Sequence, residues 1–69
     1  MSFRQLREKA NMTQSALAKK LGVTSVAINN YERGKRVPNI FTISKLAEIL
    51  NVQIEEVVKC FDKSRDKVV

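Results

Sequence analysis

The apolar residues of this chain recur at three- and four-residue spacings, and short polar residues of the helix-capping type interrupt them. Phe3, Leu6 and Ala10 share one face of a helix with about 3.6 residues per turn. Ser2 stands directly before them, where an N-terminal capping residue is expected. The pattern therefore predicts a first helix that begins after Ser2 and ends near Asn11.

The same two signals predict four more helices. In chain order, their expected spans are 14–21 after Thr13, about 25–33 after Thr24, 40–50 after Asn39, and 54–61. Gly22, Gly34 and Asn51 come after the helices expected over 14–21, about 25–33 and 40–50. Glycine and asparagine most readily take the left-handed conformation that ends a helix. The expected fold is all-α: a compact five-helix domain over residues 1–61, followed by a charged tail over residues 62–69 that we expect to fray.

The second and third predicted helices are joined by only about three residues. So short a connection cannot lay two helices side by side, and it makes them cross steeply, as in a helix-turn-helix. Ala18 is small where the two helices would touch, Gly22 provides the turn, and Val23 is expected to fill the space beneath it. Leu17 and Ile28 lie on the faces that we expect to be buried.

The charge of the chain is unevenly distributed. The 69 residues include 13 Lys and Arg against 7 Asp and Glu, a net charge of +6. Residues 1–36 hold eight basic and two acidic residues, whereas residues 37–69 hold five of each. A basic half on so small a domain indicates a polyanionic partner, nucleic acid first and an acidic membrane surface second. Charge kept only for solubility is the alternative.

The composition excludes several classes of protein. With no histidine and one cysteine, the chain has no plausible zinc site, and we expect neither a metal nor a cofactor. No paired-carboxylate site or phosphate-binding loop is present, so an enzyme is not expected. No apolar run approaches the ~20 residues of a membrane span, and the first residues lack an apolar signal segment. We therefore expect a cytoplasmic protein without a membrane partner.

Successive side chains of a helix are rotated by about 100° around its axis. If Ile28 marks the core side of the third predicted helix, four of its side chains point away from the core. These side chains are Val26, Asn29, Asn30 and Arg33. Asparagine can bond bidentately to adenine, arginine can bond to guanine or phosphate, and valine can contact the thymine methyl group. The face therefore suits DNA reading, with a plain solvated surface as the alternative.

Residues 14–34 resemble the helix-turn-helix of the Cro/cI-type (Xre) family. The stretch QSALAKKLGVTSVAINNYERG, taken with Thr13, meets nearly every position of the pattern T-Q-x-x-L-A-x-x-x-G-V-S-x-x-x-I-S-x-x-E-x-G, with Thr24 in place of the usual serine. The likeness extends over about residues 3–61. It implies a five-helix, repressor-type domain that binds operator DNA, usually as a homodimer.

The resemblance also implies roles for particular residues. It places four side chains in the major groove: Ser25, Val26, Asn29 and Asn30. It places Gln14 on a phosphate and the loop of residues 34–37, with Lys35 and Arg36, on the DNA backbone; Arg33 is a further phosphate candidate. Arg7 and Glu32 occupy positions that often pair in the family. The pair either clamps two helices together or aims Arg7 at a phosphate.

Self-association is expected because one reading helix carries too few side chains to find a site in a genome. The resemblance places this surface around the fourth and fifth helices, where the candidates are Val52, Glu55, Val58 and Phe61; the alternative is that the apolar ones close the monomer core. The predicted function is sequence-specific binding of a near-palindromic double-stranded operator by a small transcriptional regulator, with repression as the expected mode. The alternative is a protein-binding module on the same fold, such as an antitoxin or a coactivator domain.

Overall fold

The computed structural model describes residues 2–61, and these residues form five α helices. In chain order, the helices are α1 (Phe3–Lys9), α2 (Gln14–Leu21), α3 (Ser25–Glu32), α4 (Ile40–Leu50) and α5 (Ile54–Phe61). The all-α, five-helix prediction is thus confirmed for this part of the chain. The charged tail predicted over residues 62–69 lies outside the described residues.

Side-chain caps begin the first four helices, as predicted. Ser2 Oγ accepts a hydrogen bond from the Gln5 amide at 3.2 Å, and the Gln5 side chain accepts one from the Ser2 amide at 2.8 Å. Thr13, Thr24 and Asn39 each accept a bond from the amide three residues further on. Each cap satisfies a backbone donor that the helix itself leaves unpaired, so the helix starts follow from local chemistry.

Residues in the left-handed conformation end α2 and α4. Gly22 has a φ of 82° and Asn51 a φ of 57°, as expected for both positions. The first helix is shorter than predicted: it ends at Lys9, because Asn11 has a φ of 60° and cannot continue a right-handed helix. The third helix also stops one residue before its predicted end.

The core is built from side chains of all five helices. The side chains that are fully buried are Leu17, Ile28, Leu46 and Val57. The aromatic rings of Phe3, Tyr31 and Phe61 pack together with centroids 5.3 to 6.3 Å apart, which joins α1, α3 and α5. The predicted burial of Leu17 and Ile28 is confirmed. These contacts fix α2 and α3 against the rest of the domain.

One apolar residue lies outside the core, contrary to the sequence analysis. Val23 is 36% exposed, so the prediction that it fills the space beneath the turn is wrong. The amides of Gly22 and Val23 both bond to the Ala18 carbonyl oxygen. Ile40, three residues before the buried Ile43 and in the first turn of α4, is also exposed.

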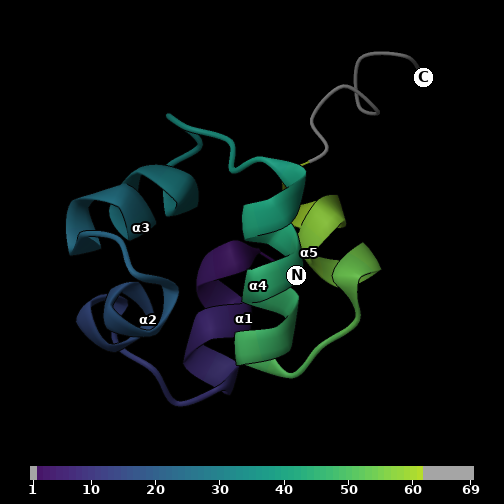
Figure 1. Ribbon diagram of the computed structural model, residues 1–69, viewed down its shortest axis with the longest axis horizontal. Coiled ribbons are helices and arrows are strands. Elements are labelled where there is room, and N and C mark those ends of the chain that lie inside the picture. Colours follow the sequence, from purple (N-terminus) through teal and green to yellow (C-terminus); the bar gives the residue numbers. More distant parts are fainter. Residues whose placement is uncertain (1, 62–69) are drawn as a thin grey trace.

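The five helices are arranged so that α2 and α3 form one end of the molecule. In Figure 1, α2 and α3 lie on the left, α5 lies on the right, and α1 and α4 occupy the centre. Helix α2 packs against α3 and α4, whereas α1 packs against α3 and α5. Helix α3 is therefore supported from one side and presents its other side outward.

Candidate nucleic-acid interface

The connection between α2 and α3 has the geometry of a helix-turn-helix. The Gly22 and Val23 amides bond to the Ala18 carbonyl oxygen at 2.8 and 2.9 Å, and Thr24 then caps α3 by accepting a bond from the Ala27 amide at 3.2 Å. Ala18 is buried, as expected for a small residue at the helix crossing. Three residues therefore redirect the chain from α2 into α3, and every step is held by a hydrogen bond.

The outward side of α3 forms one shallow hollow of about 240 Å³. Its lining residues are Gln14, Ser25, Val26, Asn29, Asn30 and Arg33. All four residues predicted to read bases are thus brought together, along with two of the residues predicted to contact phosphates. The opposite side of α3 is buried, through Ala27, Ile28 and Tyr31. The sequence-based division of this helix into a core side and an outer side agrees with the structure.

The hollow combines chemical groups that suit the major groove. Asn29 and Asn30 are half-buried and line the hollow. Val26 and Ser25 are exposed at the start of the helix. The face therefore offers amide donors and acceptors, a hydroxyl group and an apolar group side by side, the set of groups that base edges and thymine methyl groups can contact.

A buried polar network ties α1, α2 and α3 together behind this hollow. The Arg7 Nε donates to Glu32 Oε2 at 2.5 Å, and an Arg7 Nη donates to the Met12 carbonyl oxygen at 2.7 Å. The Gln14 Nε2 donates to Glu32 Oε1 at 3.0 Å. The Arg7 and Glu32 side chains are only 10% and 7% exposed. The pair therefore has the geometry of the clamp alternative, and its burial gives no support to a phosphate contact by Arg7.

The bond between Gln14 and Glu32 was not expected from the sequence. The two residues are 18 positions apart, and no periodicity connects them. The bond uses one hydrogen of the Gln14 amide group and leaves the other available to a phosphate. Gln14 also begins α2, where the first backbone N–H groups of a helix lack acceptors within the helix. The position thus remains suited to a phosphate contact, with Glu32 holding the side chain in place.

Further basic side chains are exposed in the loop after α3 and on α2. Lys35 and Arg36 are exposed in the loop between α3 and α4, and the Lys35 amide bonds to the Asn30 carbonyl at 2.9 Å, which holds the loop against the end of α3. On α2, Lys19 and Lys20 are exposed. The two acidic residues of this half are engaged in ion pairs, Glu32 with Arg7 and Glu8 with Arg4, so they do not offset these exposed bases.

Other features of the described residues do not suggest chemistry. Over residues 2–61, no group of three or more metal-binding side chains occurs, and no helix is long and apolar enough to cross a membrane. Burial raises the pKa of the Cys60 thiol, and the Glu56 carboxylate adds to the effect. The Cys60 Sγ donates to the Glu56 carbonyl at 3.2 Å, so this cysteine packs on its helix.

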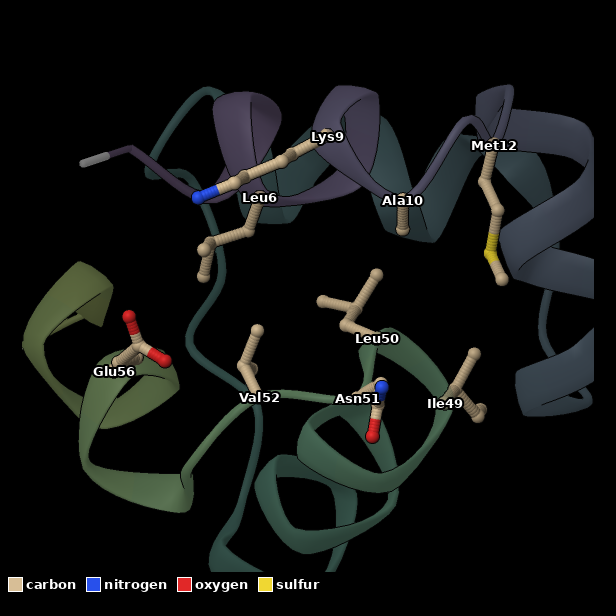
Figure 2. Close-up of a pocket in the computed structure, with 9 residues that line it drawn as sticks. All are labelled: Leu6, Lys9, Ala10, Met12, Ile49, Leu50, Asn51, Val52 and Glu56. Atoms are coloured by element: carbon tan, nitrogen blue, oxygen red, sulfur yellow. The ribbon is translucent and has the colours of Figure 1, made fainter.

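A larger cavity, of about 530 Å³, lies away from the hollow on α3. Figure 2 shows it between α1 and the junction of α4 with α5, with Leu6, Leu50 and Val52 around its apolar interior and Lys9 and Glu56 on its border. None of its lining residues belongs to α2 or α3. The cavity and the candidate nucleic-acid interface are therefore separate features.

Fold and interface together define a helix-turn-helix protein, and comparison with known proteins agrees. The sequence model of a helix-turn-helix family, HTH_3, matches residues 3–57. This chain belongs to that family and is of the Cro/cI (Xre) type. The resemblance found in residues 14–34 is confirmed.

Several similar proteins carry names of transcriptional regulators. A protein of Archaeoglobus fulgidus named as an uncharacterized HTH-type transcriptional regulator is 39% identical over 55 residues, which cover 80% of this chain and 78% of that protein. The HTH-type transcriptional repressor RghR of Bacillus subtilis is 45% identical over 77% of this chain and 40% of its own length. The HTH-type transcriptional activator BcrR of Enterococcus faecalis is 36% identical over 81% of this chain and 28% of its own length. No solved structure matches the chain.

Proposed function

We propose that this protein is a transcriptional regulator that binds double-stranded DNA sequence-specifically, with α3 in the major groove. The observation that carries the proposal is the single hollow on α3, which gathers Ser25, Val26, Asn29 and Asn30 with Gln14 and Arg33. Membership of the helix-turn-helix family and the regulator names of similar proteins support it.

The proposed division of labour follows from residue chemistry. Asn29 and Asn30 read base edges, because an amide can donate and accept to the same adenine. Val26 contacts thymine methyl groups, and Ser25 bonds to a base near the start of α3. The residues proposed to hold phosphates are Gln14, Arg33, Lys35 and Arg36. Phosphate contacts set the position of α3 and carry no sequence information themselves.

We further propose that the protein acts as a repressor in the cytoplasm, by covering the DNA that it binds. Occupation of an operator is the simplest way for a DNA-binding domain to act, and the name of the similar repressor RghR supports repression. No catalytic step, metal or cofactor enters the proposal. The alternative of a protein-binding module has no observation in its favour, because the outer side of α3 carries amides and basic neighbours suited to DNA.

Two-fold binding to a near-palindromic site completes the proposal. One domain contributes a single reading helix, and specific DNA interfaces are usually larger than one such helix provides. Two copies would place their α3 helices about 34–36 Å apart, in successive major grooves on one side of the DNA. Footprinting should therefore show two protected half-sites about one helical turn apart. Protection of one half-site alone would rule out the dimer and leave DNA binding intact.

The matched pair Asn30→Ala and Lys35→Ala tests the proposed roles. Selection from a random duplex pool should show that Asn30→Ala relaxes base preference at one position, by about 1–3 kcal/mol of discrimination. Lys35→Ala should weaken binding to all duplexes alike, because it removes a phosphate contact. Unchanged base preference in the Asn30 variant would contradict its assignment, and altered preference in the Lys35 variant would contradict the phosphate role.

A further inference from the structure

The outer side of α3 carries two side-chain amides that are available to a ligand. Within residues 2–61, no hydrogen bond engages the side-chain amide of Asn29 or Asn30. No polar side-chain atom of the buried and half-buried residues in this range is shut off from solvent without a partner, so both amides reach the surface. Both residues line the hollow on α3. Each amide therefore offers an acceptor oxygen and donor hydrogens to a molecule that enters the hollow.

An apolar group lies beside these amides. Val26 is 65% exposed, and it precedes Asn29 by three residues and Asn30 by four, so it is a neighbour of both on the helix surface. In the major groove, an adenine–thymine pair presents the N6 donor and N7 acceptor of adenine and the C5 methyl group of thymine. The four residues proposed to read bases include no arginine or lysine, the side chains that most often bond to guanine. The reading surface therefore favours adenine–thymine pairs.

We propose that the protein recognises adenines that are unmethylated at N6, and that N6 methylation of the adenines facing Asn29 and Asn30 weakens its binding to the operator. The inference rests on the proposed function, because it concerns the same surface of α3. In a bidentate contact, the asparagine amide oxygen accepts a hydrogen bond from adenine N6, and the amide nitrogen donates one to N7. One N6 hydrogen pairs with thymine, and the other points into the major groove. A methyl group that leaves the base pair intact replaces the second hydrogen, which the amide oxygen needs.

Methylation would act on this contact in two ways. It removes the donor for the amide oxygen, and an acceptor left without a donor in a desolvated interface costs free energy. It also places a methyl group against that oxygen. Val26 does not compensate, because a contact with the added methyl group leaves the oxygen without its donor. We expect the binding constant to fall by about tenfold or more for each methylated adenine that α3 reads.

Duplexes with single altered bases test this inference. The starting duplex is one obtained by selection from a random, unmethylated pool. Each adenine in the protected site is replaced in turn by N6-methyladenine, or by 7-deazaadenine, which lacks the N7 acceptor. Both replacements should weaken binding at the same positions, because they remove the two halves of one bidentate contact. N6-methyladenine outside the protected site is the matched control and should leave binding unchanged.

Protein variants assign the sensitivity to the two amides. In Asn30→Ala the effect of methylation should disappear at one adenine, and in Asn29→Ala at another, because no bond remains there to be lost. Lys35→Ala is the control: it should weaken binding to every duplex and keep the wild-type ratio of affinities for unmethylated and methylated DNA. Circular dichroism establishes that each variant is folded. Where a variant binds too weakly to measure, the two base replacements in the wild-type complex decide the question.

Equal binding of the unmethylated duplex and of every methylated duplex would overturn the inference, and so would tighter binding of a methylated one. A selected site without adenine–thymine pairs would also overturn it, as would a methylation effect that both asparagine variants keep in full. The two proposals fail in distinguishable ways. A chain that binds no duplex would contradict the proposed function and this inference with it, whereas sequence-specific binding that is insensitive to N6 methylation would contradict this inference alone.

Discussion

Replacing Glu32 with alanine removes the carboxylate that accepts hydrogen bonds from both Arg7 and Gln14. The Arg7 guanidinium would then stay buried without its counter-charge. Removal of one member of a buried ion pair typically costs about 3–5 kcal/mol. Arg7 keeps its bond to the Met12 carbonyl at 2.7 Å, so we expect a loss near the lower limit, about 3 kcal/mol.

A loss of that size matters because the domain is small. Domains are stable by about 5–15 kcal/mol, and one of this size lies near the lower end. Urea unfolding followed by circular dichroism should therefore show Glu32→Ala losing about half of the free energy of unfolding or more. The matched control is Glu8→Ala, which breaks the exposed pair between Arg4 and Glu8 and should cost at most about 0.5 kcal/mol.

A double variant separates the loss of the pair from the cost of an unpaired charge. Arg7→Met/Glu32→Leu removes both charges and keeps comparable side-chain volume, so it should be more stable than Glu32→Ala alone. The reasoning would be refuted if Glu32→Ala lost no more than about 1 kcal/mol, in the range of an exposed pair. It would also be refuted if the double variant were less stable than the single one, because the unpaired charge would then not be the cause.

Further predictions concern the core, the turn, the thiol and the charge. Leu17→Ala and Ile28→Ala should each cost about 2–5 kcal/mol in urea unfolding; native melting would contradict their complete burial. Gly22→Ala should lower the free energy of unfolding by about 1 kcal/mol, because Gly22 has a φ of 82°, which disfavours a side chain, although no atom lies within 4 Å of an added Cβ. Gly22→Asn should lower it less, because asparagine tolerates this conformation better than alanine. Equal losses for the two variants would point to another cause. Cys60 should react with a thiol reagent more slowly in the folded than in the urea-unfolded protein, because burial raises the pKa of the thiol and lowers the fraction present as thiolate. The difference in rate should shrink as the pH rises through the raised pKa. Equal rates at neutral pH would contradict this prediction. If about five phosphates are neutralised, the logarithm of the DNA-binding constant should fall with the logarithm of salt concentration with a slope near −4 to −5, and a flat dependence would exclude the basic surface as the binding site.

The sequence predicts the helices of this protein well because their boundaries are local. Ser2, Thr13, Thr24 and Asn39 cap helices through bonds to amides three residues away, and Gly22 ends one through its own backbone conformation. Such signals require no knowledge of the rest of the fold. The outer side of α3 was likewise predictable, because a rotation of about 100° per residue decides which side chains oppose the core.

Contacts between distant segments could not be predicted in the same way. The bond from Gln14 to Glu32 depends on how α2 crosses α3, and no repeat in the sequence encodes that crossing. Helical spacing groups Ile40 with Ile43, but it does not show that Ile43 is buried and Ile40 exposed. Helical spacing also did not distinguish Phe61, which packs against Phe3, from Phe41, which is 79% exposed.

The most direct test of the central claim is a nuclear magnetic resonance titration of the ¹⁵N-labelled chain with a duplex obtained by selection from a random pool. The account predicts that the largest changes fall on the backbone amides of α3 and the loop after it, and on the side-chain NH₂ groups of Asn29 and Asn30, since these groups meet base edges. The cavity between α1 and α5 should be little affected. Changes confined to that cavity or to the outer face of α4, with the Asn29 and Asn30 side chains unmoved, would contradict the claim that α3 reads DNA.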